Sequence, residues 1–191
     1  MANSDTATGL SPVQYLNGAP YNGQTNTYQI AAAEASGNIH VGDAVSLAGG
    51  LDATGRYQLV TKGAINGVFV GVITAVEMET ADSLPYRAAL TLRNVHVADD
   101  PNIVFEIQED GDTTPIAVAN GTKNASLILG TGSTTTGLSG WEIDSTTVAA
   151  TATLDLLLLR LADRPDNEVG AYAKWLVRLN NHQYVDGSLG V

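Results

Sequence analysis

The sequence predicts an all-β protein: a compact β-barrel or β-sandwich with an extended N-terminal arm and little helix. Short runs of β-branched, aromatic and other apolar residues recur along the chain, and turn residues, among them many of its 20 glycines, separate these runs. No long stretch repeats apolar residues at the spacing of a helix face. The 191 residues are enough for one such domain with an arm. A jelly roll is the alternative architecture.

Residues 1–28 are expected to form the arm, and residues 29–191 a single β-rich domain. The arm is polar and rich in Gly, Asn, Thr and Pro, with isolated aromatic residues at Tyr15, Tyr21 and Tyr28. One interpretation is a disordered tail. The other is an arm that orders on a partner, in which case these three tyrosines are the candidate contact residues.

Strands are expected throughout the domain, and the run over residues 68–76 is apolar enough to be buried on both faces. Within that run, Gly71 is expected to mark a bulge or a close approach of two backbones. Residues 27–36, which include four alanines, are the one candidate helix. The expected strands cover residues 39–47, 57–62, 68–76, 87–97, 103–108, 126–130, 141–143, 151–161 and 173–179.

The last two expected strands are the most apolar part of the chain. The run over residues 151–161 has leucines at both odd and even positions, so both of its faces should be buried. The strand over residues 173–179 alternates, with Trp175 and Val177 pointing inward. Between the two strands, Arg164, Asp166 and Glu168 are expected to pair around a corner.

Composition excludes several classes of function. The chain has no cysteine, which rules out disulfides and thiolate chemistry. It has 9 Lys+Arg against 20 Asp+Glu, a net charge of −11, so nucleic acid is not an expected partner. The sequence shows neither a signal peptide nor an apolar run long enough to cross a bilayer, so no membrane association is expected. Glycosylation at the sequons of Asn120 and Asn124 is not expected either.

No pattern in the chain predicts catalysis, a cofactor or a metal. Ser139 lies between two glycines, but the spacing is not that of a nucleophile elbow, and a turn serine is the better interpretation. Residues 109–112 are acidic but lack the ligand spacing of a calcium loop, so a solvated turn is expected. His40, His96 and His182 are far apart in the chain, and His182 is expected at a surface or an interface. We therefore expect a protein that is not an enzyme.

Four segments of the C-terminal half carry a family resemblance. They are residues 99–110 (DDPNIVFEIQED), 136–144 (TGLSGWEID), 164–170 (RPDNEVG) and 173–183 (AKWLVRLNNHQ). Together they resemble a family of structural proteins of tailed bacteriophages, the head decoration or cement proteins, over about residues 85–184. Residues 41–71 are similar in style to the barrels of such proteins.

The resemblance implies a protein that is made in the bacterial cytoplasm and lies on the capsid exterior of the virion. Its expected partners are the major capsid protein, whose lattice it would stabilise, and further copies of itself. A homotrimer is favoured and a homodimer is the alternative. Another virion module, from a tail or a fibre, and a non-viral adhesive β domain are the other functions that remain open.

Overall fold

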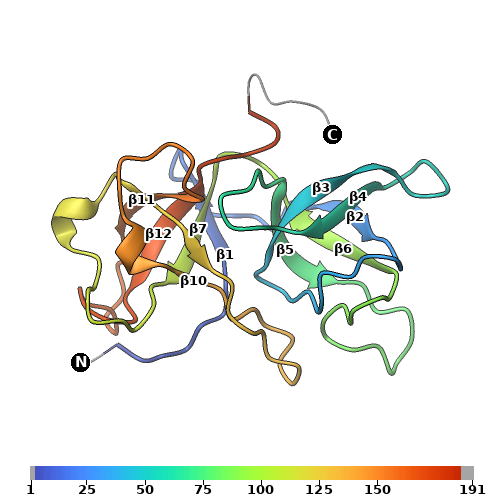
Figure 1. The fold of residues 1–191 in the computed structure, drawn as a ribbon, viewed down its shortest axis with the longest axis horizontal. Helices are drawn as coiled ribbons and strands as arrows, with labels where there is room; N and C mark the ends of the chain where they lie inside the picture. Colours follow the sequence, from blue (N-terminus) through green and yellow to red (C-terminus); the bar gives the residue numbers. More distant parts are fainter. Residues whose placement is uncertain (1–2, 186–191) are drawn as a thin grey trace.

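The computed structural model describes residues 3–185, which form two β lobes side by side (Figure 1). The first lobe is a closed five-stranded barrel in the order β2-β4-β3-β5-β6. We call it the barrel lobe. Its strands are β2 (Asn26–Ile30), β3 (Ala44–Leu51), β4 (Gln58–Lys62), β5 (Gly71–Val76) and β6 (Arg93–Ala98).

The second lobe, which we call the sheet lobe, is built on an open five-stranded sheet in the order β1-β7-β12-β11-β8. The short pair β9–β10 lies beside it, and two 3-10 turns, η1 and η2, complete its secondary structure. The elements are β1 (Ser11–Tyr15), β7 (Ile103–Gln108), η1 (Val118–Asn120), β8 (Asn124–Ala125), β9 (Leu127–Ile128), β10 (Glu142–Ile143), η2 (Ser145–Thr147), β11 (Leu156–Leu161) and β12 (Lys174–Leu179). The prediction of a compact all-β fold is confirmed.

The predicted N-terminal arm is wrong. β1 pairs antiparallel with β7, where Ser11 lies opposite Glu106, and β2 is one of the five strands that close the barrel. The barrel lobe is therefore inserted in the chain between two neighbouring strands of the sheet lobe, β1 and β7. Residues 1–2 of the predicted arm and residues 186–191 of the predicted domain lie outside the described residues.

The candidate helix over residues 27–36 is wrong as well. Tyr28 and Ile30 alternate with polar residues in β2, and both are buried in the barrel core. Four alanines within residues 31–35 are too few to nucleate a helix against that pattern. The chain from Ala31 to Asn38 is a loop.

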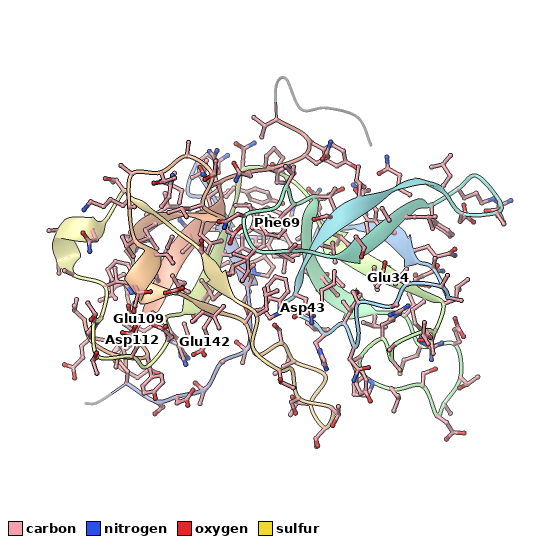
Figure 2. All side chains as sticks on the ribbon, in the orientation of Figure 1. Glu34, Asp43, Phe69, Glu109, Asp112 and Glu142 are labelled. Atoms are coloured by element: carbon pink, nitrogen blue, oxygen red, sulfur yellow. The ribbon has the colours of Figure 1, made fainter. Side chains whose placement is uncertain are left out.

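Each lobe has its own apolar core. The barrel core is aliphatic apart from Tyr28, whereas the core of the sheet lobe holds both tryptophans and both phenylalanines. Phe69 enters the sheet core from the barrel side, and Figure 2 shows it between the lobes. The barrel core consists of Tyr28, Ile30, Ile39, Val45, Val60, Val70, Ile73, Val95 and Val97.

Several contacts fix one lobe to the other. The backbone N–H of Phe69 donates to the Asn181 carbonyl at 2.9 Å, and Phe69 accepts from the Gln183 N–H at 2.7 Å. Beyond this bridge the Tyr184 hydroxyl donates to Gln58 Oε1 at 2.6 Å. The C-terminal part of the sheet lobe thus runs on to the barrel wall.

The closing strand pair follows its prediction in part. β12 matches the predicted strand, but β11 begins at Leu156 rather than at residue 151, and its Leu157 and Leu159 are only partly buried, so the predicted burial of both faces is wrong. Trp175 and Val177 are buried on the core face of β12, next to β11. Arg164 pairs with Asp166 at 3.1 Å, as expected for a braced corner, and it also reaches Glu106 on β7 at 2.7 Å. The predicted close approach at Gly71 is confirmed too, because a Cβ there would collide with the Ala98 carbonyl on β6.

A candidate docking loop on the barrel lobe

The connection between β5 and β6, which we call the 77–92 loop, exposes four large apolar side chains. Met78 is 74% exposed, Leu84 43%, Leu90 63% and Leu92 45%. Single exposed apolar residues are common, but four large ones within a single connection make this loop the candidate for contact with another macromolecule. The sequence reasoning missed this loop because it assigned residues 87–92 to a strand, whereas β6 begins at Arg93.

A buried arginine holds the 77–92 loop in place. The side chain of Arg87 is fully buried, and its guanidinium donates only to backbone carbonyls. Nε reaches Thr91 at 2.8 Å, Nη1 reaches Gly37 at 3.2 Å, and Nη2 reaches Ala31 at 2.9 Å and Glu34 at 2.8 Å. Burial lowers the pKa of Arg87, and the charge of Glu34 opposes that change. One side chain therefore ties the loop to the neighbouring loop over residues 31–38.

Leu90, three residues after Arg87, has an unfavourable backbone conformation. Its φ is +59°, in the left-handed region, where a residue with a Cβ is strained by roughly 1–2 kcal/mol. The Leu90 N–H donates to the Glu34 carbonyl at 3.3 Å, and the Ala89 N–H donates to Asn38 Oδ1 at 3.0 Å. Strained residues persist where their surroundings fix them, and they concentrate at functional sites.

Polar contacts brace the two ends of the 77–92 loop. Arg93 Nη1 pairs with Glu79 Oε2 at 2.6 Å, and Asn94 Nδ2 donates to Glu77 Oε2 at 3.1 Å. The Ser83 hydroxyl accepts the N–H of Glu79 at 3.1 Å. The apolar side chains are thus presented by a loop that is already ordered, so little conformational entropy is left to lose on binding.

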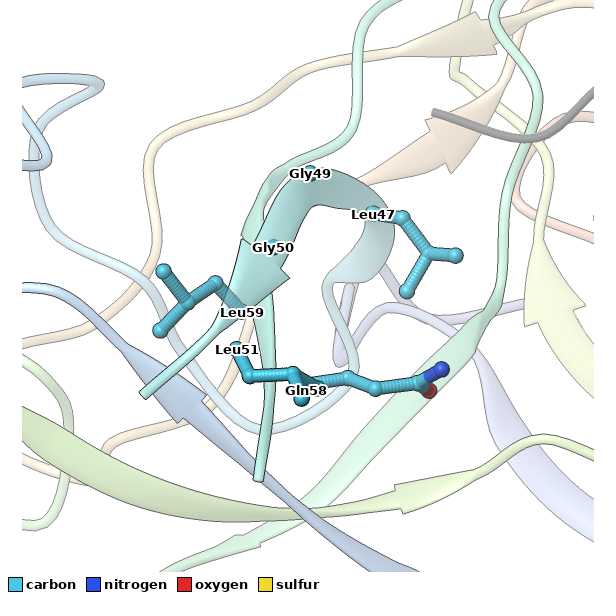
Figure 3. Close-up of a pocket in the computed structure, with 6 residues that line it drawn as sticks. All are labelled: Leu47, Gly49, Gly50, Leu51, Gln58 and Leu59. Atoms are coloured by element: carbon cyan, nitrogen blue, oxygen red, sulfur yellow. The ribbon is translucent and has the colours of Figure 1, made fainter. Parts of the chain in front are cut away.

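A shallow hollow lies on the β3–β4 hairpin of the same lobe (Figure 3). Its lining comes from both strands, and it forms where the register of the pair shifts between Leu47 and Leu51. Its volume of about 180 Å³ is below the roughly 300 Å³ at which small-molecule sites begin, so this hollow is not indicated as a small-molecule site. The lining residues are Leu47, Gly49, Gly50, Leu51, Gln58 and Leu59.

The three predicted contact tyrosines do not form one surface. Tyr28 is 3% exposed and donates its hydroxyl proton to Asp99 at 2.7 Å, so it is a core residue and its predicted contact role is wrong. Burial raises its pKa, and its hydrogen bonds to Tyr184 and Asp99 add to the effect. Tyr15 and Tyr21 pack on the sheet core with their ring centroids 6.1 Å apart. For these two, a role in partner contact stays a prediction.

The predicted turn residues have structural roles. Ser139 is 2% exposed, and its Oγ accepts the N–H of Trp141 at 3.1 Å, as expected for a turn serine. In the acidic segment 109–112, Asp112 accepts from the Ser145 hydroxyl at 3.0 Å. Glu109 is fully buried rather than solvated, which corrects the prediction, and burial raises its pKa to about 7. Figure 2 shows Glu109, Asp112 and Glu142 on the same side of the sheet lobe.

The histidines lie apart. His182 is 4% exposed, so its predicted surface position is wrong, and burial lowers its pKa. His40 is buried, stacks on Tyr86 at 5.1 Å and lies 3.9 Å from Asp43. His96 faces Glu77 at 3.3 Å. Within residues 3–185 there is no group of three His, Asp or Glu side chains that could hold a metal ion.

The comparisons with known proteins gave no relative. No protein-family model, curated protein or solved structure matches this chain. In the part of the chain that the structure describes, no helix is long and apolar enough to cross a membrane. The 77–92 loop, clamped by Arg87, is therefore the candidate functional site on its own geometry.

Proposed function

We propose that this protein is a bacteriophage capsid decoration protein that binds the outer surface of the major capsid protein lattice through the 77–92 loop. The observation that carries the proposal is the presentation of Leu90, an exposed apolar side chain that a buried guanidinium and two backbone contacts hold in a strained conformation. Apolar anchors on an ordered scaffold supply most of the free energy of typical protein interfaces.

Charge and fold support the same proposal. A net charge of −11 keeps copies of the protein soluble at high local concentration. A β framework with two cores is a stiff body that can reinforce the shell to which it binds. Repetition over a lattice multiplies the effect of a modest individual contact. The resemblance of residues 85–184 to cement proteins adds the capsid exterior of the virion as the location, with synthesis in the host cytoplasm.

Two other functions would use the same loop. A tail or fibre module would place it against another virion component, and a non-viral adhesive β domain would place it against a cell-surface partner. Neither of these two functions explains the resemblance to head proteins as directly as capsid decoration does. Binding to capsids is expected of a decoration protein and of neither alternative, so it distinguishes the proposal from both.

The test is binding of the purified protein to expanded phage heads that lack it. We expect saturable, near-stoichiometric binding, which Leu90→Asn weakens at least tenfold, because asparagine tolerates a positive φ but removes the apolar contact. The matched control is Val118→Asn, which changes an apolar residue that is 73% exposed on the sheet lobe. Wild-type protein that fails to bind heads would overturn the decoration proposal. Equal binding by Leu90→Asn and wild type would overturn the role of the loop.

A further inference from the structure

The imidazole ring of His40 is buried without a hydrogen bond. The residue is 3% exposed, and within residues 3–185 neither of its ring nitrogens has a hydrogen-bond partner, although both are shielded from solvent. A neutral imidazole carries one N–H donor and one acceptor, so both groups are unsatisfied in the folded protein. Most buried polar atoms have a partner, and an unsatisfied one costs stability. The surroundings of this ring therefore need an explanation.

The His40 ring contacts two loops. It stacks on Tyr86 of the 77–92 loop, with the ring centroids 5.1 Å apart and 23° between the planes. It also lies against Gly132, where an added Cβ would collide with the ring. Gly132 belongs to residues 129–141 between β9 and β10, which we call the 129–141 connection. The ring therefore links the sheet lobe to the loop that presents Leu90.

The residues before and after this histidine are hydrogen-bonded to the same two loops. The Ile39 N–H donates to the Arg87 carbonyl at 2.9 Å, and the Arg87 N–H donates back at 2.8 Å. The Val41 N–H donates to the Gly137 carbonyl at 3.0 Å, and the Val41 carbonyl accepts from the Ser139 N–H at 2.8 Å. A displacement of the ring would therefore act on the backbone that joins the 77–92 loop to the 129–141 connection.

Protonation would place a charge in this contact with little to balance it. Asp43 Oδ2 lies 3.9 Å from His40 Nδ1, too far for a hydrogen bond, and Lys62 Nζ lies 3.8 Å from the same oxygen. From the two loops, Tyr86 offers a ring face that attracts a cation only weakly, and Gly132 offers no side chain. Burial lowers the pKa of His40; the charge of Asp43 opposes this effect and the charge of Lys62 adds to it.

Acid should therefore weaken the contact. A base whose pKa is lower in the closed state than in the open state takes up its proton more readily when open. The contact is then most stable above pH 6.5, the ordinary pKa of histidine, and loses stability as the pH falls below that value. Between pH 7.5 and 5.5, this linkage raises the open fraction by up to about tenfold.

We propose that His40 is a pH-sensitive switch for the 77–92 loop: the neutral ring holds the loop against the 129–141 connection, and protonation of the ring releases it. The consequence for capsid binding rests on the decoration proposal. A released loop no longer presents Leu90 in a fixed conformation, so binding to heads should weaken in acid. The order of the loop itself is a property of the free protein.

Amide hydrogen exchange at pH 7.5 and 5.5, corrected for the intrinsic pH dependence of exchange, tests the proposal. In wild type we expect protection of the Ile39, Val41 and Arg87 amides to fall by up to about tenfold at pH 5.5, with no such fall in β11 and β12. His40→Phe keeps an aromatic ring that cannot take up a proton, so its loop protection should not fall. His40→Gln, which is smaller and also neutral, should give the same result.

The matched control is His96→Gln. His96 faces Glu77 at 3.3 Å, at the start of the same loop, so a variant at this position should keep the wild-type response. Equal pH responses in wild type and in the His40 variants would overturn the proposal, and so would loss of the response in His96→Gln.

Titration of the His40 ring in wild type, followed by nuclear magnetic resonance, is a second measurement that needs no variant to fold. We expect the ring to take up its proton below pH 6.5, and uptake at or above that pH would contradict the switch. Both experiments use the free protein. Their failure is therefore a separate result from a failure of the protein to bind heads.

Discussion

The two lobes stabilise their structures in different ways. The barrel lobe closes its hydrogen-bonded sheet on itself and has a core that is aliphatic apart from Tyr28. It holds its longest loop with an arginine whose three guanidinium nitrogens all donate to backbone carbonyls. The sheet lobe is open, packs both tryptophans on one face, and buries Glu109, whose Oε1 has no partner in the described part of the chain. The difference shows that the barrel lobe holds a long loop with the hydrogen bonds of a fully buried side chain, whereas the sheet lobe carries a buried carboxylate that ties its stability to pH.

The largest effect is expected from the sheet core. Trp141 is fully buried, so Trp141→Ala should lower the free energy of unfolding by about 3–5 kcal/mol. Ile73→Val in the barrel core should cost about 0.5–1.5 kcal/mol. Denaturant unfolding followed by far-ultraviolet circular dichroism measures both. Because Phe69 joins the two lobes, we expect one transition, and a separate barrel transition in Trp141→Ala would show that the lobes are independent.

Arg87→Met should have the next largest effect. The substitution leaves carbonyls of the 77–92 loop and of the loop over residues 31–38 without donors, so the free energy of unfolding should fall by about 2–4 kcal/mol. Amide hydrogen exchange should accelerate in residues 31–38 and 77–92 and stay unchanged in β11 and β12. The control is Arg93→Met, which breaks a partly exposed ion pair and should cost less than about 1 kcal/mol. Uniform acceleration across both lobes would contradict a local clamp.

Glu109 should make the stability of the sheet lobe depend on pH. Burial raises its pKa from 4.5 to about 7, so the folded state loses stability as the pH rises from 4.5 to about 7 and stays at the lower value above that. Glu109→Gln should abolish this pH-dependent loss of stability and raise the free energy of unfolding by about 1–3 kcal/mol at pH 8. Denaturant unfolding from pH 4 to 8 measures both effects. A parallel pH profile for the variant would sink this prediction.

The barrel hairpin should show the opposite pH dependence. Hydrogen bonds from Thr54 and from the Tyr57 N–H lower the pKa of Asp52 to about 2. The stability that the Asp52 carboxylate adds to the folded state is therefore present above pH 3.8 and lost as the pH falls towards 2. Asp52→Asn should reduce the acid-induced loss of stability without changing the profile above pH 5.

The smallest effects on stability are expected at two residues that share a positive φ. Leu90 in the barrel lobe and Tyr172 in the sheet lobe both have a φ near +60°. Leu90→Gly should raise stability by about 0–1 kcal/mol, because glycine removes strain at an exposed site. Tyr172→Gly should lower it, because the Tyr172 ring packs directly on Gly111. Thermal unfolding of the two variants checks the contrast, and two shifts of the same sign would contradict it.

The sequence predicted the parts of the fold that local periodicity encodes. The alternation of Trp175 and Val177 was sufficient for β12, because one buried face imposes a period of two. The leucines of β11 predicted burial on both faces, whereas only Leu156 and Leu158 are buried, because the periodicity of a fully apolar run does not show which face the core covers. The placement of β1 was not predictable, since its pairing with β7 joins Ser11 to Glu106 across nearly a hundred residues. Its Pro12 is typical of a loop and is tolerated because β1 is an edge strand.

The candidate site was beyond the reach of the sequence for a different reason. Leu90 and Leu92 alternate with polar residues as in a strand, so their exposure in a loop has no local signal. Nothing near Arg87 in the sequence distinguishes a buried arginine from a solvated one, because its carbonyl partners Ala31, Glu34 and Gly37 lie some fifty residues earlier. Only the fold brings the two loops together.

The insertion of the barrel between β1 and β7 has a consequence for synthesis. All five barrel strands lie within residues 26–98, so the ribosome has released them before β11 and β12 exist. We expect the barrel to form first, while β1 remains unpaired until β7 emerges. The sheet lobe, assembled last, then extends its Asn181–Tyr184 segment across Phe69 to the barrel wall. A ribosome stalled near residue 130 should therefore carry a formed barrel and an unassembled sheet.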